Sequence, residues 1–144
     1  LAGSGPEEAA LRELVARTGA DVTFAGHLSG HELHRLIGRA KALVLPSEWY
    51  ENAPISVLEA YALGRPVLGA AIGGIPEMVR EGETGMLSAA GDVQGLASKL
   101  AALAALSGAE RRRMGLAGRD WIAREFSAAA YQERTLALYS ALSG

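Results

Sequence analysis

Glu51 and Glu59, two glutamates eight positions apart, are the residues of this sequence best suited to chemistry. Pro54 stands between them and fits the first position of a helix, where its missing N–H is not needed. The amides of the next residues would then lie in the first helical turn, without intrahelical acceptors and at the positive end of the helix dipole. Such a terminus binds an anion without needing a lysine. The amides concerned belong to Ile55, Ser56 and Val57.

The two carboxylates could bind the neutral parts of a ligand whose anionic part contacts these amides. Glu59 lies too far inside the expected helix to cap it, but it can accept two hydrogen bonds from a vicinal diol such as ribose. Glu51 lies in the preceding loop and could meet a polyol on the other side of the anion. A sugar, a diphosphate and a nucleoside would fit in this order. The alternatives are two surface charges beside an ordinary helix start, or an acid–nucleophile pair, which requires carboxyls facing each other about 5–10 Å apart.

Gly73 and Gly74 form a second unusual loop, followed by Pro76 and Glu77. Paired glycines after a strand let the backbone approach a ligand closely. Pro76 fits the start of a short helix with Glu77 in its first turn. The alternative is a tight turn between a strand and a helix.

Short apolar runs that alternate with helical patterns predict the elements that position these loops. Near-continuous apolar strands separated by helices indicate an α/β domain with a parallel sheet covered on both faces. Ligands of such sheets bind at the carboxyl ends of the strands, which is where the unusual loops lie. We expect one domain over 1–144 with a helical tail over about 92–144. The expected strands are 21–26, 42–46, 66–72 and 85–89, and the expected helices begin at Pro6, after Ser29 and at Pro54.

The composition excludes several classes of function. The net charge of −2 and the lack of a long basic tract argue against a nucleic-acid partner. Without cysteine, the chain has no disulfide, zinc–thiolate site or thiol nucleophile. We expect no metal site, since His31 and His34 have no carboxylate at a suitable spacing. No apolar run is long enough to span a bilayer, so a cytoplasmic protein is expected, which could lie at the membrane surface through another segment.

Taken together, these motifs resemble the C-terminal, donor-binding domain of a retaining GT-B glycosyltransferase of family four, also called group one. The segment LPSEWYENAPISVLEAYALGRPV is similar to the family pattern P-S-x-x-E-x7-E-A-x-A-x-G-x-P-V. The following GGIPEMVREGETG is similar to G-G-x-P-E-x-V-x-x-G-x-T-G. LAGSGPE, VTFAGHLSGHEL and ALVLPS look like three further landmarks in the same order. The resemblance covers nearly the whole chain and implies a Rossmann-like open sheet.

The resemblance also implies roles for single residues. Glu51 would contact the donor sugar near the reaction centre, as the catalytic residue of the site, and Glu59 would hold the nucleotide ribose. The diphosphate would meet the amides of the helix start, while backbone near His27 and Leu28 would line the base. The sugar would be met by Asn52, Ala53, Gly73, Gly74 and Glu77. The donor would be a nucleotide-diphosphate sugar, UDP- or GDP-linked, bound as a substrate, with no cofactor and no metal.

One departure from the family pattern concerns the beginning of the chain. Such domains open with a strand, a Gly-Arg-Leu segment and a lysine, whose cations neutralise the diphosphate, whereas this chain begins Leu1-Ala2-Gly3. We therefore expect an incomplete donor domain that lacks the first strand and the N-terminal domain for the acceptor, which could be a sugar, a lipid or a small molecule. We expect little or no transfer by this chain alone. The alternatives are an epimerase-like sugar-nucleotide enzyme and a non-catalytic α/β interaction domain.

Overall fold

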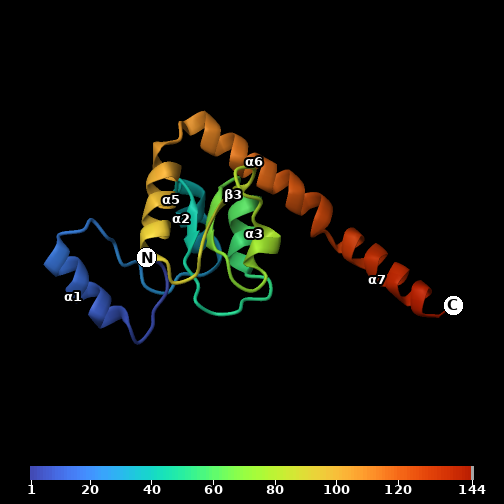
Figure 1. Ribbon diagram of the computed structural model, residues 1–144, viewed down its shortest axis with the longest axis horizontal. Helices are drawn as coiled ribbons and strands as arrows, with labels where there is room; N and C mark the ends of the chain where they lie inside the picture. Colours follow the sequence, from blue (N-terminus) through green and yellow to red (C-terminus); the bar gives the residue numbers. More distant parts are fainter. Residues whose placement is uncertain (144) are drawn as a thin grey trace. The chain divides into compact units, whose positions relative to one another are not determined.

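The computed structural model describes residues 1–143 and divides the chain into two compact units. The first unit is Leu1–Arg35 and the second is Leu36–Gly144. Figure 1 shows the elements of both, and each unit is described by itself. The expectation of one domain over 1–144 stays a prediction.

The first unit contains α1, Glu8–Thr18, which begins close to the predicted start at Pro6. Gly19 ends the helix in the left-handed conformation, with φ of 67°, and its N–H donates to the Val15 carbonyl at 2.9 Å. Glycine adopts this conformation without steric cost. Helix α2, Gly30–Arg39, begins after Ser29, as predicted, and ends in the second unit.

The segment 21–26 does not form the predicted strand. Its backbone instead bonds to the first residues of the chain: the Leu1 amino group donates to the Thr23 carbonyl, and the Ala25 N–H donates to the Leu1 carbonyl. A third bond runs from the Gly3 N–H to the Gly26 carbonyl, and the short pairing does not continue into the ladder that a strand needs. The β-branched and apolar composition of the segment was therefore a misleading signal.

The second unit is built on a three-stranded parallel sheet in the order β1-β2-β3. The strands are β1, Leu43–Leu45, β2, Val67–Ala70, and β3, Gly85–Ser88. Each lies inside its predicted range. All four residues of β2 are buried, because β2 pairs on both edges and helices pack on it. The predicted α/β fold with an open parallel sheet is confirmed.

Five helices follow these strands or connect them. Figure 1 shows α3 and α5 on opposite sides of β3, which confirms that helices lie on both faces of the sheet. The predicted helical tail is also confirmed, and α6 begins with a capping box between Ser107 and Glu110. The helices are α3, Ile55–Ala62, α4, Ile75–Met78, α5, Val93–Ala105, α6, Gly108–Glu125, and α7, Ala128–Leu142.

Two glycines let α6 pack closely on α3. A Cβ atom on Gly115 would lie 2.0 Å from the Gly64 carbonyl oxygen, and one on Gly118 would lie 2.2 Å from the Tyr61 ring. Tyr61 is fully buried, and its hydroxyl shares a hydrogen bond of 2.8 Å with the Thr84 hydroxyl. The close contacts of Gly115 and Gly118 hold α6 against the end of α3.

Tyr61 predicts a loss of stability in strong alkali. Burial raises its pKa from 10.0 to about 12. Between these two values the unfolded chain loses the phenolic proton while the folded chain keeps it, so the free energy of unfolding falls as the pH rises. The full loss is about 2–3 kcal/mol. Denaturant unfolding at pH 9 to 12 should show this loss in the wild type relative to Tyr61→Phe. If the free energies of unfolding of the two proteins changed with pH in parallel, the prediction would be contradicted.

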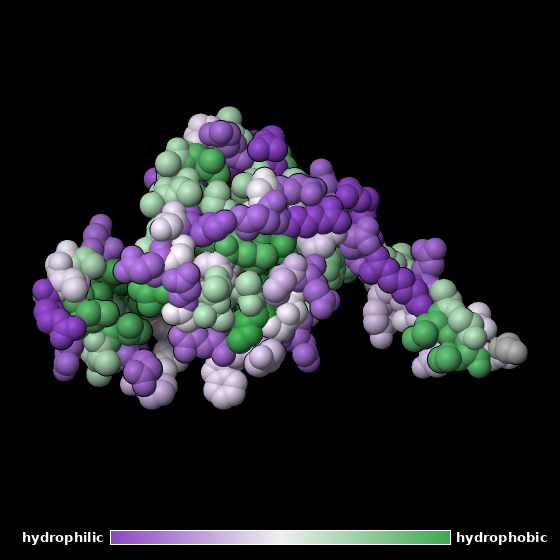
Figure 2. All heavy atoms as spheres, viewed as in Figure 1, coloured by the Kyte–Doolittle hydropathy of each residue, from purple (hydrophilic) through white to green (hydrophobic). Residues whose placement is uncertain are grey.

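Helix α7 has no buried residue, and Figure 2 shows hydrophobic side chains gathered on it. These include Leu136, Leu138 and Leu142, each more than half exposed. Across residues 1–143, none of the helices combines the length and the hydropathy that a bilayer crossing requires.

Candidate functional site

The predicted site loops meet at the carboxyl edge of the sheet. The segment 46–54 follows β1 and the segment 71–74 follows β2, and these strands are neighbours. A direct bond joins the loops: the Gly74 N–H donates to the Glu51 carbonyl at 2.6 Å. Parallel α/β sheets bind ligands at this edge.

Both glycines of the second loop lie against the backbone of the first. A Cβ on Gly74 would lie 1.8 Å from the Asn52 carbonyl oxygen, and one on Gly73 would lie 2.5 Å from that of Glu51. Gly73 also has a φ of +56°. The prediction that these glycines let the backbone approach a ligand closely stays a prediction. The structure shows that they let the two loops touch.

The start of α3 differs in one respect from the sequence prediction. Pro54 is the N-cap, with φ −65° and ψ 116°, and not the first helical residue. The Val57 N–H donates to the Pro54 carbonyl at 3.0 Å, so the prediction that this amide lacks an intrahelical acceptor was wrong. Within residues 1–143, the amides of Ile55 and Ser56 have no acceptor. The helix start thus offers two amides to an anion rather than three.

The two glutamates lie on either side of this helix start. Glu51 is half-buried in the loop, and the Ser47 hydroxyl donates a long hydrogen bond of 3.5 Å to its Oε1. Glu59 is half-buried on α3, one turn beyond Ile55, which is about 6 Å along the helix axis. The carboxylates therefore belong to separate elements, with the two amides between them along the chain.

The remaining predicted residues divide between the two units. Asn52 and Ala53 are exposed in the loop before α3, and Glu77 is exposed on α4. His27, which is exposed, and Leu28, which is half-buried, precede α2 in the first unit. Their proposed part in binding the base stays a prediction.

Ser47 is a site residue that the sequence argument missed. Its hydroxyl accepts from the Trp49 N–H at 3.3 Å, and this contact turns the chain between β1 and Glu51. The signal was a serine one residue after the proline that ends the strand, a common turn composition. Trp49 and Tyr50, which follow it, are 82% and 84% exposed, so they do not belong to the core.

Among residues 1–143, no group of three or more His, Asp or Glu side chains could hold a metal ion. The groups that the structure places at this edge are amides, carboxylates and small polar side chains. It can bind an anion flanked by hydroxyl-bearing groups.

Comparison with known proteins gives the same family as the sequence motifs. The family model for glycosyl transferases group 1 matches residues 1–121. The sulfoquinovosyl transferase SQD2 of Arabidopsis thaliana is 39% identical over 104 residues, covering 70% of this chain and 20% of the relative. This coverage shows that the chain corresponds to only a part of such enzymes.

Solved structures of GT-B glycosyltransferases have the same fold. Sucrose-phosphate synthase from Thermosynechococcus elongatus superposes with a TM-score of 0.80 at 30% identity, over 97% of this chain and 37% of that one. Anabaena Alr3699/HepE in complex with UDP also gives a TM-score of 0.80, at 23% identity over 97% of this chain and 40% of that one. HepE has also been solved with UDP-glucose. The chain belongs to the group 1 glycosyltransferase family.

Proposed function

We propose that this chain binds a nucleotide-diphosphate sugar for glycosyl transfer with retention of configuration. The observation that carries the proposal is the start of α3, where the amides of Ile55 and Ser56 lack acceptors and lie between Glu51 and Glu59 in the chain. Amides at a helix start favour a diphosphate. Carboxylates accept hydrogen bonds from sugar and ribose hydroxyls.

The relatives support a nucleotide-sugar donor. HepE has been solved with UDP and with UDP-glucose, and we carry this donor class over to the present chain. Glu59 would take the ribose and Glu51 the sugar near the reaction centre. Retention is what the family resemblance implies, and the acceptor would be held by a second domain. Since the chain spans about a fifth to two fifths of the relatives' lengths, we expect little transfer by it alone.

The expected result of a nucleotide panel is selective thermal stabilisation of this chain. UDP, GDP and ADP would be compared by thermal unfolding, since a ligand at ten times its Kd adds about 1.4 kcal/mol to the free energy of unfolding. One nucleotide should stabilise more than the others. A non-catalytic interaction domain predicts no stabilisation by any of them, and that outcome would reject the proposal.

A further inference from the structure

A cleft of about 430 Å³ lies at the opposite edge of the sheet from the donor loops. Lys41 precedes β1, and Arg65 and Pro66 precede β2, so the cleft is at the amino ends of the strands. The length of β2, about 10 Å, separates it from the loop that contains Gly73 and Gly74. The cleft is thus a different place from the proposed donor site, and nothing in the donor proposal uses it.

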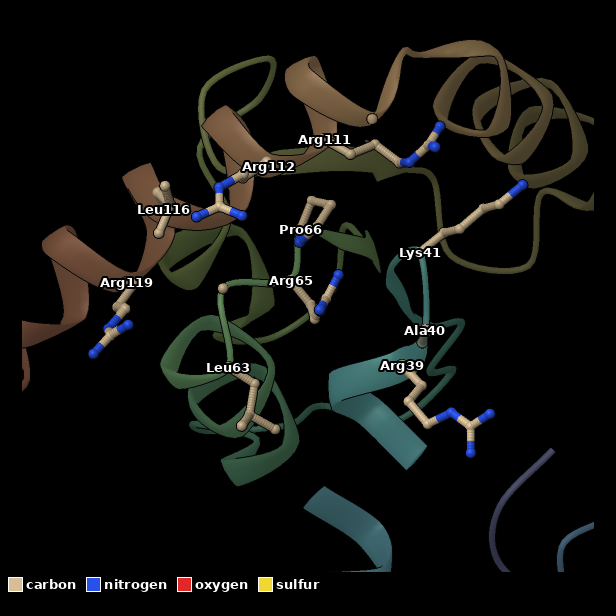
Figure 3. A pocket seen from close by; sticks show the side chains of 12 residues that line it. Arg39, Ala40, Lys41, Leu63, Arg65, Pro66, Arg111, Arg112, Leu116 and Arg119 are labelled. Carbon is tan, nitrogen blue, oxygen red and sulfur yellow. The ribbon is translucent and has the colours of Figure 1, made fainter. Parts of the chain in front are cut away.

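The charged side chains that line the cleft are all positive. Figure 3 shows Arg65 near the centre, with Arg112 and Arg119 on one side and Arg39 and Lys41 on the other. No Asp or Glu lines it. The chain as a whole has a net charge of −2, so this concentration is local. The cationic lining residues are Arg39, Lys41, Arg65, Arg111, Arg112 and Arg119.

Close packing of helices creates this concentration. Because Gly115 lets α6 approach the carbonyl of Gly64, α6 lies beside the turn that carries Arg65. Arg112 and Arg119 are seven positions apart on α6 and therefore share a face, with Leu116 between them. The packing of α6 on α3 thus sets these arginines next to Arg65.

Protein groups leave most of this charge uncompensated. Arg111 donates to the carbonyls of Ala104 and Leu106, at the end of α5. The other five cations form no ion pair within residues 1–143, and the buried Nε of Arg65 has no hydrogen-bond partner. The C-termini of α2, α3 and α5 together supply about −1.5 charges. The positive charge of the six cations is much larger than this negative charge. Compensation of helix dipoles therefore does not explain why the cations gather here.

We propose that this cleft binds a compact phosphate-bearing polyanion at a site distinct from the donor site. Guanidinium groups match phosphate oxygens with paired hydrogen bonds, and the cleft is within the size range of small-ligand pockets. The ligand is either a free di- or polyphosphate or the phosphate headgroup of an anionic lipid. Both carry the phosphate oxygens that the guanidinium groups lining the cleft would bind.

The test uses two charge-matched double variants of α6. Arg112→Gln with Arg119→Gln removes two exposed cations that line the cleft. Arg113→Gln with Arg124→Gln removes two exposed cations of the same helix that do not line it. Thermal unfolding verifies that each variant folds, and Arg39→Gln with Lys41→Gln is a second cleft variant on another segment. Each protein is titrated with inorganic pyrophosphate and sedimented with phosphatidylcholine vesicles, with and without phosphatidylglycerol.

The cleft variants should lose at least about tenfold in binding, since each removes charge-assisted hydrogen bonds, while the Arg113/Arg124 variant stays close to the wild type. A selective loss in the pyrophosphate titration supports a soluble ligand, and one confined to phosphatidylglycerol vesicles supports a lipid headgroup. Equal losses of affinity in the cleft and control variants would mean that binding depends only on net charge, which would overturn the proposal. Unchanged binding in the cleft variants, or no binding by the wild type to either probe, would overturn it as well.

Discussion

Replacing Gly74 by alanine is expected to destabilise the protein by about 3 kcal/mol and to weaken nucleotide binding. The added Cβ would lie 1.8 Å from the Asn52 carbonyl oxygen, which is backbone and cannot rotate away. The loop before α3 would have to move, and the hydrogen bond from Gly74 to Glu51 would be lost with it. Thermal unfolding should show a melting temperature lower by about 10 °C.

Gly38→Ala is the matched control for this change. Gly38 lies inside α2, and a Cβ there meets no atom within 4 Å. Alanine should leave its stability unchanged or raise it by up to about 1 kcal/mol, with nucleotide binding intact. If Gly74→Ala melted and bound nucleotide as Gly38→Ala does, the close contact between the two site loops would not be needed for folding or for binding.

Glu59→Gln and Glu51→Gln are expected to have different effects on ligand binding. Glu59→Gln should weaken binding of the free nucleotide about tenfold, because a carboxylate bonded to the ribose hydroxyls is replaced by a neutral amide. Glu51→Gln should leave the free nucleotide unaffected and remove the extra affinity of the nucleotide sugar. In an enzyme form that includes the acceptor domain, Glu51→Gln should lower turnover about a hundredfold through lost electrostatic stabilisation.

The comparison requires the same nucleotide with and without its sugar. The wild type and both variants are titrated with UDP and UDP-glucose, or with the pair that the thermal panel selects. The affinity of each variant is then compared with that of the wild type, for the nucleotide and for the nucleotide sugar. Glu133→Gln, at an exposed position on α7, is a charge-matched reference. Equal weakening of free nucleotide by both Glu51 and Glu59 variants would contradict the division of roles between sugar and ribose.

The sequence predicted the start of α3 to within one residue. Pro54 marks this start because a helix start depends on residues within one turn. The motif around Glu51 and Glu59 also gave the family. The segment 21–26 was misread because its composition favours a strand, whereas strand formation depends on which partner lies beside it.

Contacts between distant segments could not be predicted in the same way. The sequence shows two adjacent glycines at positions 73 and 74, but not that their Cα atoms lie against Glu51 and Asn52. The basic cleft draws its charges from the end of α2 and the turn after it, from the turn before β2 and from α6, and no single stretch of the sequence contains it. Such sites depend on how helices pack, which the spacing of residues along the chain does not record.

The most direct test of the donor-site assignment is a residue-resolved titration of this chain with nucleotide, followed by amide NMR. A nucleotide diphosphate should shift the amide signals of Ile55 and Ser56, with smaller changes at Gly73 and Gly74. The corresponding nucleoside, without phosphate, should leave the amide signals of Ile55 and Ser56 nearly unchanged. If the diphosphate bound while the NMR signals of these two amides did not shift, the start of α3 would not be the phosphate site and the assignment would be wrong.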